Sequence, residues 1–490
     1  MLPHQTCPSS GSRRWGISNL IACAYLIFLI FLTLYTTHAY IMIFLNVRRK
    51  RRTPPKSGFD LPSVTVQLPI YNERYVVQRL IRRVCQLNYP RDLLEIQILD
   101  DSTDETGSIV DQLVAEYRKR GYDIKVIRRT TRHGFKAGAL QNGLRRARGE
   151  FLAIFDADFL PPRDFLIRLI GEFQNPKVGA VQARWGHIND RVSWFTLAQA
   201  IALDGHFILE QRTRAENDLF ITFNGTGGIW RKEAIEDSGG WHTDTLTEDL
   251  DLSMRAQLRG WKIVYRDDVV VPGEIPFTVE SFRTQQSRWA RGTIQTGIKL
   301  LPKILRSHLS LFKKFEAFIQ LSAHFVYPAL LGIAVFSFPI IYFKINNILP
   351  RSYFLILSLL SIGAFAYPLY YAISQREIYP DWRRRIRFIP HIIANCMGMS
   401  LNITVSVIEG LLRKGGEFHR TPKFGDARPK INSIPSKFNP LPFLELLFGV
   451  YLLYSGMFAL VKLQLFILPF LFTYSFGFFY FGLQSLRVKS

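Results

Sequence analysis

The sequence is poor in cysteine and in regular repetition. Its 490 residues include four cysteines, scattered at Cys7, Cys23, Cys85 and Cys396, and this spacing supports neither a zinc site nor a disulfide framework. It contains no internal repeat, no low-complexity tract and no nucleic-acid-binding motif. We therefore do not expect a repeat protein, a disulfide-stapled domain or a protein that binds nucleic acid.

Acidic residues are too few to balance the basic ones. The sequence has 39 Asp and Glu residues against 62 Lys and Arg residues, a formal net charge of +23. Such an excess suits nucleic acid or an anionic membrane surface. Because the basic residues cluster beside apolar stretches, the pattern favours a membrane, and membrane lipids are expected partners. The clusters lie at 48–52, 383–387, 413–430 and 487–489.

Long apolar runs lie near both ends of the chain, and aromatic residues make up 14% of it, with 39 Phe. This composition predicts a multi-pass α-helical membrane protein that carries one polar domain. Within residues 1–60, the run 17–45 is too long for the apolar core of a signal peptide, so it predicts a spanning helix. The basic cluster after it predicts that the next domain faces the cytoplasm, at a plasma, inner or Golgi membrane.

The C-terminal region, residues 318–490, contains five further apolar segments. Four of them predict spans, at about 318–343, 352–373, 441–460 and 463–483. The remaining segment, 389–412, carries polar residues in a narrow stripe, a pattern typical of an interfacial helix. Five spans in total keep every basic cluster in the cytoplasm, and a sixth helix that lines a cavity is the alternative. The stripe consists of His391, Asn395, Asn402, Ser406, Glu409 and Arg413.

Residues 61–280 alternate short apolar runs with helical segments, which indicates βαβ units. Strands are predicted near 64–68, 95–99, 124–127 and 180–183, around a central run of strand length over 151–158. The central run is apolar without alternation, as in a strand buried on both faces. The sequence therefore predicts an α/β fold with a mostly parallel, Rossmann-like sheet.

Two of these strands end in paired carboxylates. Asp156 and Asp158 follow the central strand, and Asp100 and Asp101 follow the second one. Ligands bind at the carboxyl ends of strands in open α/β sheets, and carboxylates there can hold a divalent cation against a diphosphate. Surface turns are the alternative for either pair alone, but two pairs at one edge favour a nucleotide pocket.

Three later motifs could complete such a pocket. The glycine-rich run 223–228 permits close backbone approach to a ligand, or forms a simple turn. Thr247 is a plausible helix cap before Glu248 and Asp249, while Asp249 could instead accept the proton of a sugar hydroxyl. Residues 281–305 form an amphipathic helix, from which Arg288 could bind phosphate oxygens and Trp289 could stack on a sugar.

The motifs together resemble a family. Asp100-Asp101, Asp156-Ala-Asp158, Thr247-Glu248-Asp249 and Gln285-Gln-Ser-Arg288-Trp289 occur in the order found in processive family 2 glycosyltransferases of the cellulose synthase superfamily. The strings at 134–140, 181–185 and 223–227 are similar to the mannan and glucomannan synthase (cellulose synthase-like A) branch. The resemblance implies a GT-A-type domain and an inverting hexosyltransferase that moves a hexose from GDP-mannose or UDP-glucose to a growing β-linked polysaccharide.

The resemblance also implies residue roles. Asp249 would be the general base, with Glu248 and Arg288 beside it in the catalytic set, and Asp156 and Asp158 would hold Mg²⁺ or Mn²⁺. A segment within 413–430 looks like the gating loop of cellulose synthases, although Arg420 and Pro422 depart from that pattern. The implied substrate-binding residues are Pro69, Tyr71, Glu73, Asp100, Asp101, Lys136, Asp156, Asn224, Gly225, Thr226, Gln285, Trp289, Thr421 and Lys423.

Two other functions remain open on the sequence. A glycolipid synthase would use the same acids to move one hexose onto diacylglycerol or ceramide, so the acceptor is either a β-glycan or a lipid. A transporter or scaffold with a degenerate transferase domain is the non-enzymatic alternative, and the presence of every motif acid argues against it. The expected organisation is an N-terminal helix and linker over 1–60, a cytoplasmic transferase domain over 61–280, interfacial helices over 281–317 and a membrane region over 318–490.

Overall fold

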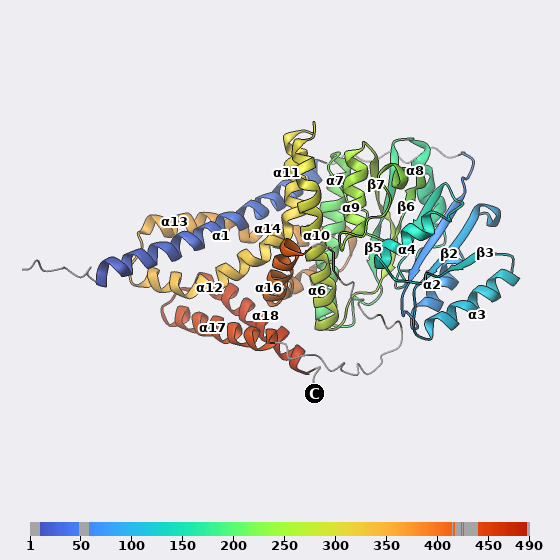
Figure 1. Cartoon of the computed structure of the whole chain (residues 1–490). Helices are drawn as coiled ribbons and strands as arrows, with labels where there is room; N and C mark the ends of the chain where they lie inside the picture. The colour runs from blue at the N-terminus through green and yellow to red at the C-terminus, as the bar shows by residue number, and fades with distance from the viewer. Residues whose placement is uncertain are drawn as a thin grey trace, which may run out of the picture.

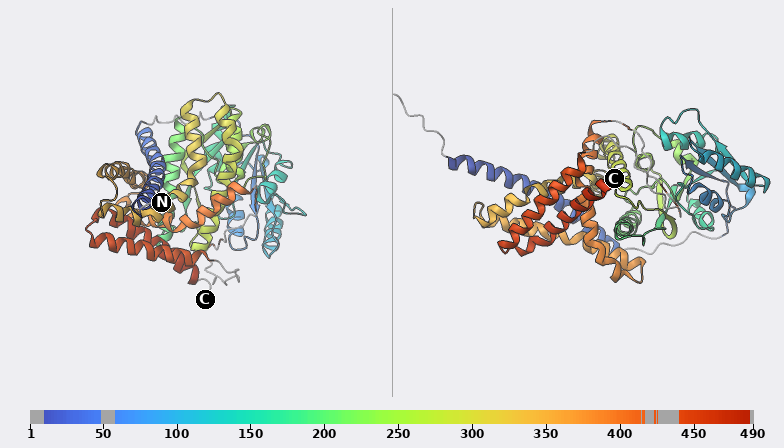
Figure 2. Two further views of the ribbon diagram at one scale, coloured as in Figure 1. Left: turned by 60° about the vertical axis from the view of Figure 1, so that its left-hand side comes forward. Right: turned by 90° about the horizontal axis from the view of Figure 1, so that it is seen from below.

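The structure is a computed structural model that describes residues 10–48, 58–413, 415–416, 423, 425 and 440–487, with residues 10–15 described by their backbone alone. A sheet domain and a group of long helices lie at opposite ends of the molecule (Figure 1). Figure 2 shows the same division from two further directions. The polar domain and the apolar helices predicted from composition are therefore separate in space.

The domain contains a seven-stranded sheet in the order β3-β2-β1-β4-β6-β5-β7. All neighbouring strands are parallel except that β6 runs antiparallel to both β4 and β5. The predicted mostly parallel sheet is confirmed, whereas β6 and β7 were not predicted as strands. The strands are β1 (Val64–Ile70), β2 (Leu94–Asp100), β3 (Asp123–Ile127), β4 (Phe151–Ile154), β5 (Val178–His187), β6 (Gly228–Arg231) and β7 (Lys262–Gly273).

Hydrophobic cores lie on both faces of the sheet. Along β4, Phe151 and Ala153 pack into one core, while Leu152 and Ile154 pack into the other. This double burial explains why the strand is apolar without alternation. The helices of the domain are α2 (Val77–Val84), α3 (Thr106–Lys119), α4 (Phe135–Leu144), α5 (Phe165–Ile170), α6 (Trp194–Gly205), a π-helix (His206–Gln211), α7 (Arg212–Glu216), α8 (Lys232–Asp237) and α9 (Glu248–Leu258).

Strand register brings the acidic motifs to one edge. Ile70 at the end of β1 pairs with Asp100 of β2, and Gln67 of β1 pairs with Ile154 at the end of β4. The backbone N–H of Asp101 donates to the carbonyl of Ile70 (3.0 Å), which extends the alignment past the strand ends. Residues that follow β1, β2 and β4 therefore share the carboxyl edge of the sheet.

The remaining helices form the apolar half of the molecule. The described residues contain six helical stretches long and apolar enough to cross a membrane, at 16–47, 311–345, 351–378, 382–412, 441–461 and 465–487. They are compatible with a multi-pass membrane protein. The helices are α1 (Ser10–Val47), α10 (Val279–Arg306), α11 (Leu311–Ser322), α12 (Val326–Ile345), α13 (Arg351–Leu360), α14 (Ala366–Ile378), α15 (Trp382–Arg385), α16 (Ile389–Leu412), α17 (Leu441–Val461) and α18 (Leu468–Arg487).

Polar side chains of the α16 stripe contact residues of α10 and α6. Asn402 Nδ2 donates to Ser287 Oγ of α10 (2.7 Å), and Glu409 pairs with Arg291 of the same helix (3.3 Å). His391 packs its ring against Trp194 of α6. These contacts join part of the stripe to α6 and α10, and the interfacial position of α16 and the count of five spans stay predictions.

Close helix packing at Gly477 gives a test of the apolar half. A Cβ on Gly477 would lie 2.2 Å from the Ala394 carbonyl of α16, so Gly477→Ala must separate α16 from α18. We expect a loss of about 2 kcal/mol, seen as a fall of several degrees in thermal unfolding in detergent. Gly16→Ala is the control, because a Cβ at Gly16 meets nothing within 4 Å. Equal melting temperatures for the two variants would contradict this packing.

Candidate active site

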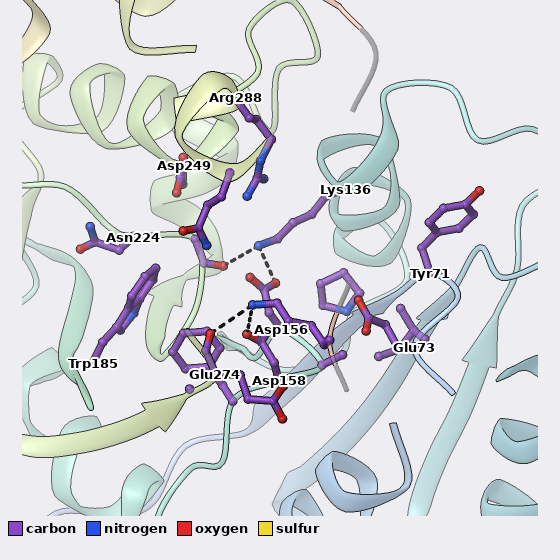
Figure 3. A pocket seen from close by; sticks show the side chains of 18 of the residues that line it. Tyr71, Glu73, Lys136, Asp156, Asp158, Trp185, Asn224, Asp249, Glu274 and Arg288 are labelled. Carbon is purple, nitrogen blue, oxygen red and sulfur yellow. Dashed lines mark hydrogen bonds and ion pairs between the residues drawn. The ribbon is translucent and has the colours of Figure 1, made fainter. Parts of the chain in front are cut away.

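A cleft opens at the carboxyl edge of the sheet, with a volume of ≈ 1300 Å³ including the space open to solvent. Its walls come from the sheet edge, the start of α9, one face of α10 and the segment after α16. Figure 3 shows Lys136 among the acids that point into it. The predicted residues that line it are Pro69, Tyr71, Glu73, Asp101, Lys136, Asp156, Asp158, Asn224, Gly225, Glu248, Asp249, Gln285, Arg288, Trp289 and Lys423.

Each carboxylate of the Asp156-Ala-Asp158 motif has a lysine partner. Lys136 Nζ lies 2.6 Å from Asp156 Oδ1, and Lys423 Nζ lies 2.6 Å from Asp158 Oδ2. Burial alone would lower the pKa of Lys136, but Asp156 and Glu248 raise it above its usual value. The two ammonium groups are bound by Asp156 and Asp158, which shows that these carboxylates favour a positive charge beside them. Its carboxylate oxygens are also the donors that Mg²⁺ and Mn²⁺ prefer, so the residues fit a divalent cation.

A second cluster of side chains that could bind a metal ion lies outside the cleft. Atoms of His242, Asp244 and Asp251 lie within 4.8 Å of one another. However, Lys299 Nζ is 2.7 Å from Asp244, 2.8 Å from Asp251 and 2.9 Å from His242. This group does not line the cleft, whereas Asp156 and Asp158 do, so a metal ion that binds a diphosphate in the cleft would be held by the Asp156-Ala-Asp158 motif.

The predicted nucleoside side contains Tyr71 and Asp101. The Arg132 guanidinium lies 3.3 Å from the centroid of the Tyr71 ring, and Arg129 Nε donates to Asp101 Oδ1 (3.0 Å). Asp100 lies behind this wall, 2% exposed, where its carboxylate accepts from Arg128 Nε (2.9 Å) and from the Ser102 N–H (3.0 Å). The structure therefore gives Asp100 contacts that hold the edge rather than a place in the cleft.

Thr226 and Thr421 are the other predicted binding residues outside the lining. Thr226 is fully buried, and its hydroxyl accepts from the backbone N–H of Asp156 (2.9 Å), so it holds the acidic motif from behind. Thr421 lies outside the described residues. Lys423 is thus the described residue that brings the segment after α16 into the cleft.

Asp249 lies across the cleft from the carboxylates of Asp156 and Asp158. Burial and the neighbouring Glu248 carboxylate raise the pKa of Asp249 to about 7, against the opposing effect of Lys136. Gly225 makes room for it, with φ +78°, and a Cβ there would lie 2.8 Å from Asp249 Oδ2. A carboxyl group that titrates near neutral pH is suited to accept a proton.

Thr247 occupies the N-cap position of α9, as predicted, but its side chain makes no cap hydrogen bond. Its hydroxyl lies 3.2 Å from the Thr296 hydroxyl of α10 instead. A Cβ on Gly292 would come within 2.5 Å of Thr247, which shows how closely the two elements pack. The Thr247 hydroxyl therefore contacts a residue of α10 rather than the backbone N–H groups at the start of α9.

Sequence reasoning missed several residues of the cleft. Glu274 follows β7, pairs with Arg79 (2.6 Å), and its carbonyl accepts from Lys423 Nζ (3.1 Å). His187 is the last residue of the long strand β5 and pairs with the buried Asp204 (3.0 Å). Recognising β7 would have placed Glu274 at the binding edge, whereas no motif marked His187 or Arg132.

Comparison with known proteins identifies the family. A model described as "Glycosyltransferase like family 2" matches residues 62–292. Glucomannan 4-beta-mannosyltransferase 7 of Arabidopsis thaliana is 35% identical over 413 residues, covering 82% of this chain and 72% of the relative. This chain belongs to glycosyltransferase family 2. Glucomannan 4-beta-mannosyltransferase 2 of the same plant is 35% identical over 438 residues, covering 85% of this chain and 80% of the relative.

A solved structure agrees with the fold of this family 2 glycosyltransferase. A mannosyltransferase from Pyrobaculum calidifontis, in complex with GDP-Man and Mn²⁺, superposes with a TM-score of 0.51 at 22% identity, covering 81% of this chain and 98% of that one. At this identity the likeness concerns the fold alone. The resemblance to the glucomannan synthase branch and the assignment as a hexosyltransferase are confirmed by the relatives.

The raised pKa of Asp249 gives a pH test for this glycosyltransferase. Since Asp249 must be ionised to accept a proton, we expect kcat/KM to rise with pH through about 7. Glu248→Gln removes the like charge that raises this pKa, so the rising limb should move to lower pH. Glu116→Gln, which changes an acid paired with Arg120 on the surface, serves as control. A limb that stays in place in Glu248→Gln would refute the assignment of Asp249.

Proposed function

We propose that this glycosyltransferase moves mannose from GDP-mannose to the end of a growing β-linked mannan or glucomannan chain. The observation that carries the proposal is the position of Asp249, a half-buried acid with a raised pKa that lines the same cleft as Asp156 and Asp158. The names of the relatives, glucomannan 4-beta-mannosyltransferases, support mannose as the sugar.

The transfer needs a base and a site for the departing diphosphate on opposite sides of the sugar. Asp249 accepts the proton of the acceptor hydroxyl, whose oxygen forms a bond to the anomeric carbon from the face opposite the diphosphate. The bond between the anomeric carbon and the phosphate oxygen breaks, and GDP leaves with the electron pair. This geometry inverts the anomeric centre, so an α-linked donor gives a β-linked product.

Charge in the cleft favours departure of GDP. Lys136 and Arg288 both line the cleft, where positive groups fixed in advance offset the negative charge that develops on the diphosphate. Asp156 and Asp158 would hold Mg²⁺ or Mn²⁺, which supplies further positive charge when bound. Trp289 offers an aromatic face to the acceptor end of the chain.

A donor screen tests the proposal. Protein purified in detergent with Mn²⁺ or Mg²⁺ should release GDP from GDP-mannose and form a water-insoluble polymer that a β-mannanase digests. Asp249→Asn should lower the rate by roughly 100- to 10,000-fold while GDP still binds, because the variant loses the base and keeps the cleft. A β-glucanase-sensitive product from UDP-glucose would change the sugar, and a chloroform-soluble single-sugar product would replace the polymer by a glycolipid.

We also propose that the catalytic domain faces the cytoplasm and that five helices span the membrane. In that topology residue 419 lies inside and Cys7 lies outside. An impermeant maleimide added to sealed cells should label Cys7 in the wild type and leave a Cys7→Ser, His419→Cys variant unlabelled until the cells are permeabilised. Labelling of position 419 from outside would make α16 a sixth span.

A further inference from the structure

One side chain of α10 contacts two segments that line the cleft. Gln295 is 5% exposed, and its Oε1 accepts from the backbone N–H of Leu246 (3.1 Å). Its Nε2 donates to the carbonyls of Arg413 (3.0 Å) and Gly415 (2.7 Å). A single carboxamide therefore uses both its acceptor and its donors to join three parts of the chain.

These three parts carry different groups of the cleft. Leu246 lines the cleft and precedes the Glu248-Asp249 pair by two residues. The helix of Gln295 itself carries Arg288 and Trp289. Lys423 follows Gly415 by eight residues, and its ammonium contacts Asp158 (2.6 Å). Gln295 thus bonds the chain just before the Glu248-Asp249 pair, and the helix that carries Arg288 and Trp289, to Arg413 and Gly415 at the end of α16.

The contact between α10 and α9 has other supports. Thr296 meets Thr247 (3.2 Å), and Lys299 pairs with the buried Asp251 (2.8 Å). Arg291 pairs with Glu409 (3.3 Å) near the end of α16. The bonds to the Arg413 and Gly415 carbonyls extend this docking past the end of α16, where a helix leaves carbonyls without helical partners.

Only a carboxamide of this length meets the observed pattern. A glutamate would still accept from Leu246, but its oxygens would face the two carbonyls, which are acceptors as well. A methionine keeps nearly the same volume and removes every hydrogen bond. Glutamate therefore removes only the bonds to Arg413 and Gly415, whereas methionine also removes the bond to Leu246.

We propose that Gln295 is a positioning residue of the transfer reaction, which sets the positions of Arg413 and Gly415, and with them that of Lys423, relative to Asp249. The inference rests on the proposed function, because it assumes that the cleft binds a nucleoside diphosphate. It assigns Gln295 no contact with substrate. Loss of Gln295 acts on the nucleotide only by displacing Lys423.

The experiment is a double-mutant cycle read out by binding. The dissociation constant of GDP with Mn²⁺ is measured by calorimetry for wild type, Gln295→Glu, Gln295→Met, Lys423→Ala and each double variant. We expect Gln295→Glu and Gln295→Met to weaken binding by a similar factor, roughly tenfold, because both variants lose the two buried hydrogen bonds to the carbonyls of Arg413 and Gly415. In the Lys423→Ala background the same changes should have an effect of less than about twofold, since groups that act through one another are not additive.

Controls separate this role from general stability. Gln464→Glu makes the same chemical change in the turn between α17 and α18, where Gln464 donates to the Lys462 carbonyl (3.1 Å), and should leave binding unchanged. Additive effects of Gln295→Glu and Lys423→Ala, or a lower melting temperature with unchanged binding, would overturn the inference. Absence of nucleotide binding by the wild-type protein, tested with GDP and UDP, would instead overturn the proposed function.

Discussion

The cleft depends on charge compensation between the two acids after β4 and lysines from other elements of the chain. Asp156 and Asp158 lie at the end of a strand buried on both faces, where an uncompensated carboxylate would be costly. Lys136 comes from α4, and Lys423 comes from the segment after α16. The second pair joins residues far apart in the chain, so a residue that follows α16 completes a site that the sheet begins.

The sequence predicted the framework of this site because its strands have a strong local signal. The apolar runs at β1, β2 and β4 and the acids that follow them gave the edge at which the cleft opens. β6 has four residues directly after a glycine-rich run, too few for a clear pattern, and it was missed. β7 was missed although it is longer, and with it Glu274, because its polar residues break the apolar run.

Other details depend on tertiary partners that local patterns do not contain. Thr247 has the residue type of a helix cap, yet its hydroxyl meets Thr296 of α10. Asp100 and Asp101 are adjacent and were assigned one role, but Asp100 turns to Arg128 behind the cleft. Asn402 and Glu409 of the stripe on α16 contact Ser287 and Arg291 of α10, partners that the spacing of the stripe does not reveal. In each case the partner comes from a distant part of the chain.

The antiparallel direction of β6 has a topological consequence. In a parallel sheet only segments that leave strands reach the carboxyl edge, while segments that enter strands lie at the opposite edge. Because β6 is reversed and pairs Gly228 with Ile154, the residues that enter it, Asn224 to Gly227, arrive at the edge where β4 ends. One reversed strand thus lets the chain deliver an incoming segment and an outgoing segment to the same place, which sets Gly225 against Asp249 without a long connecting loop.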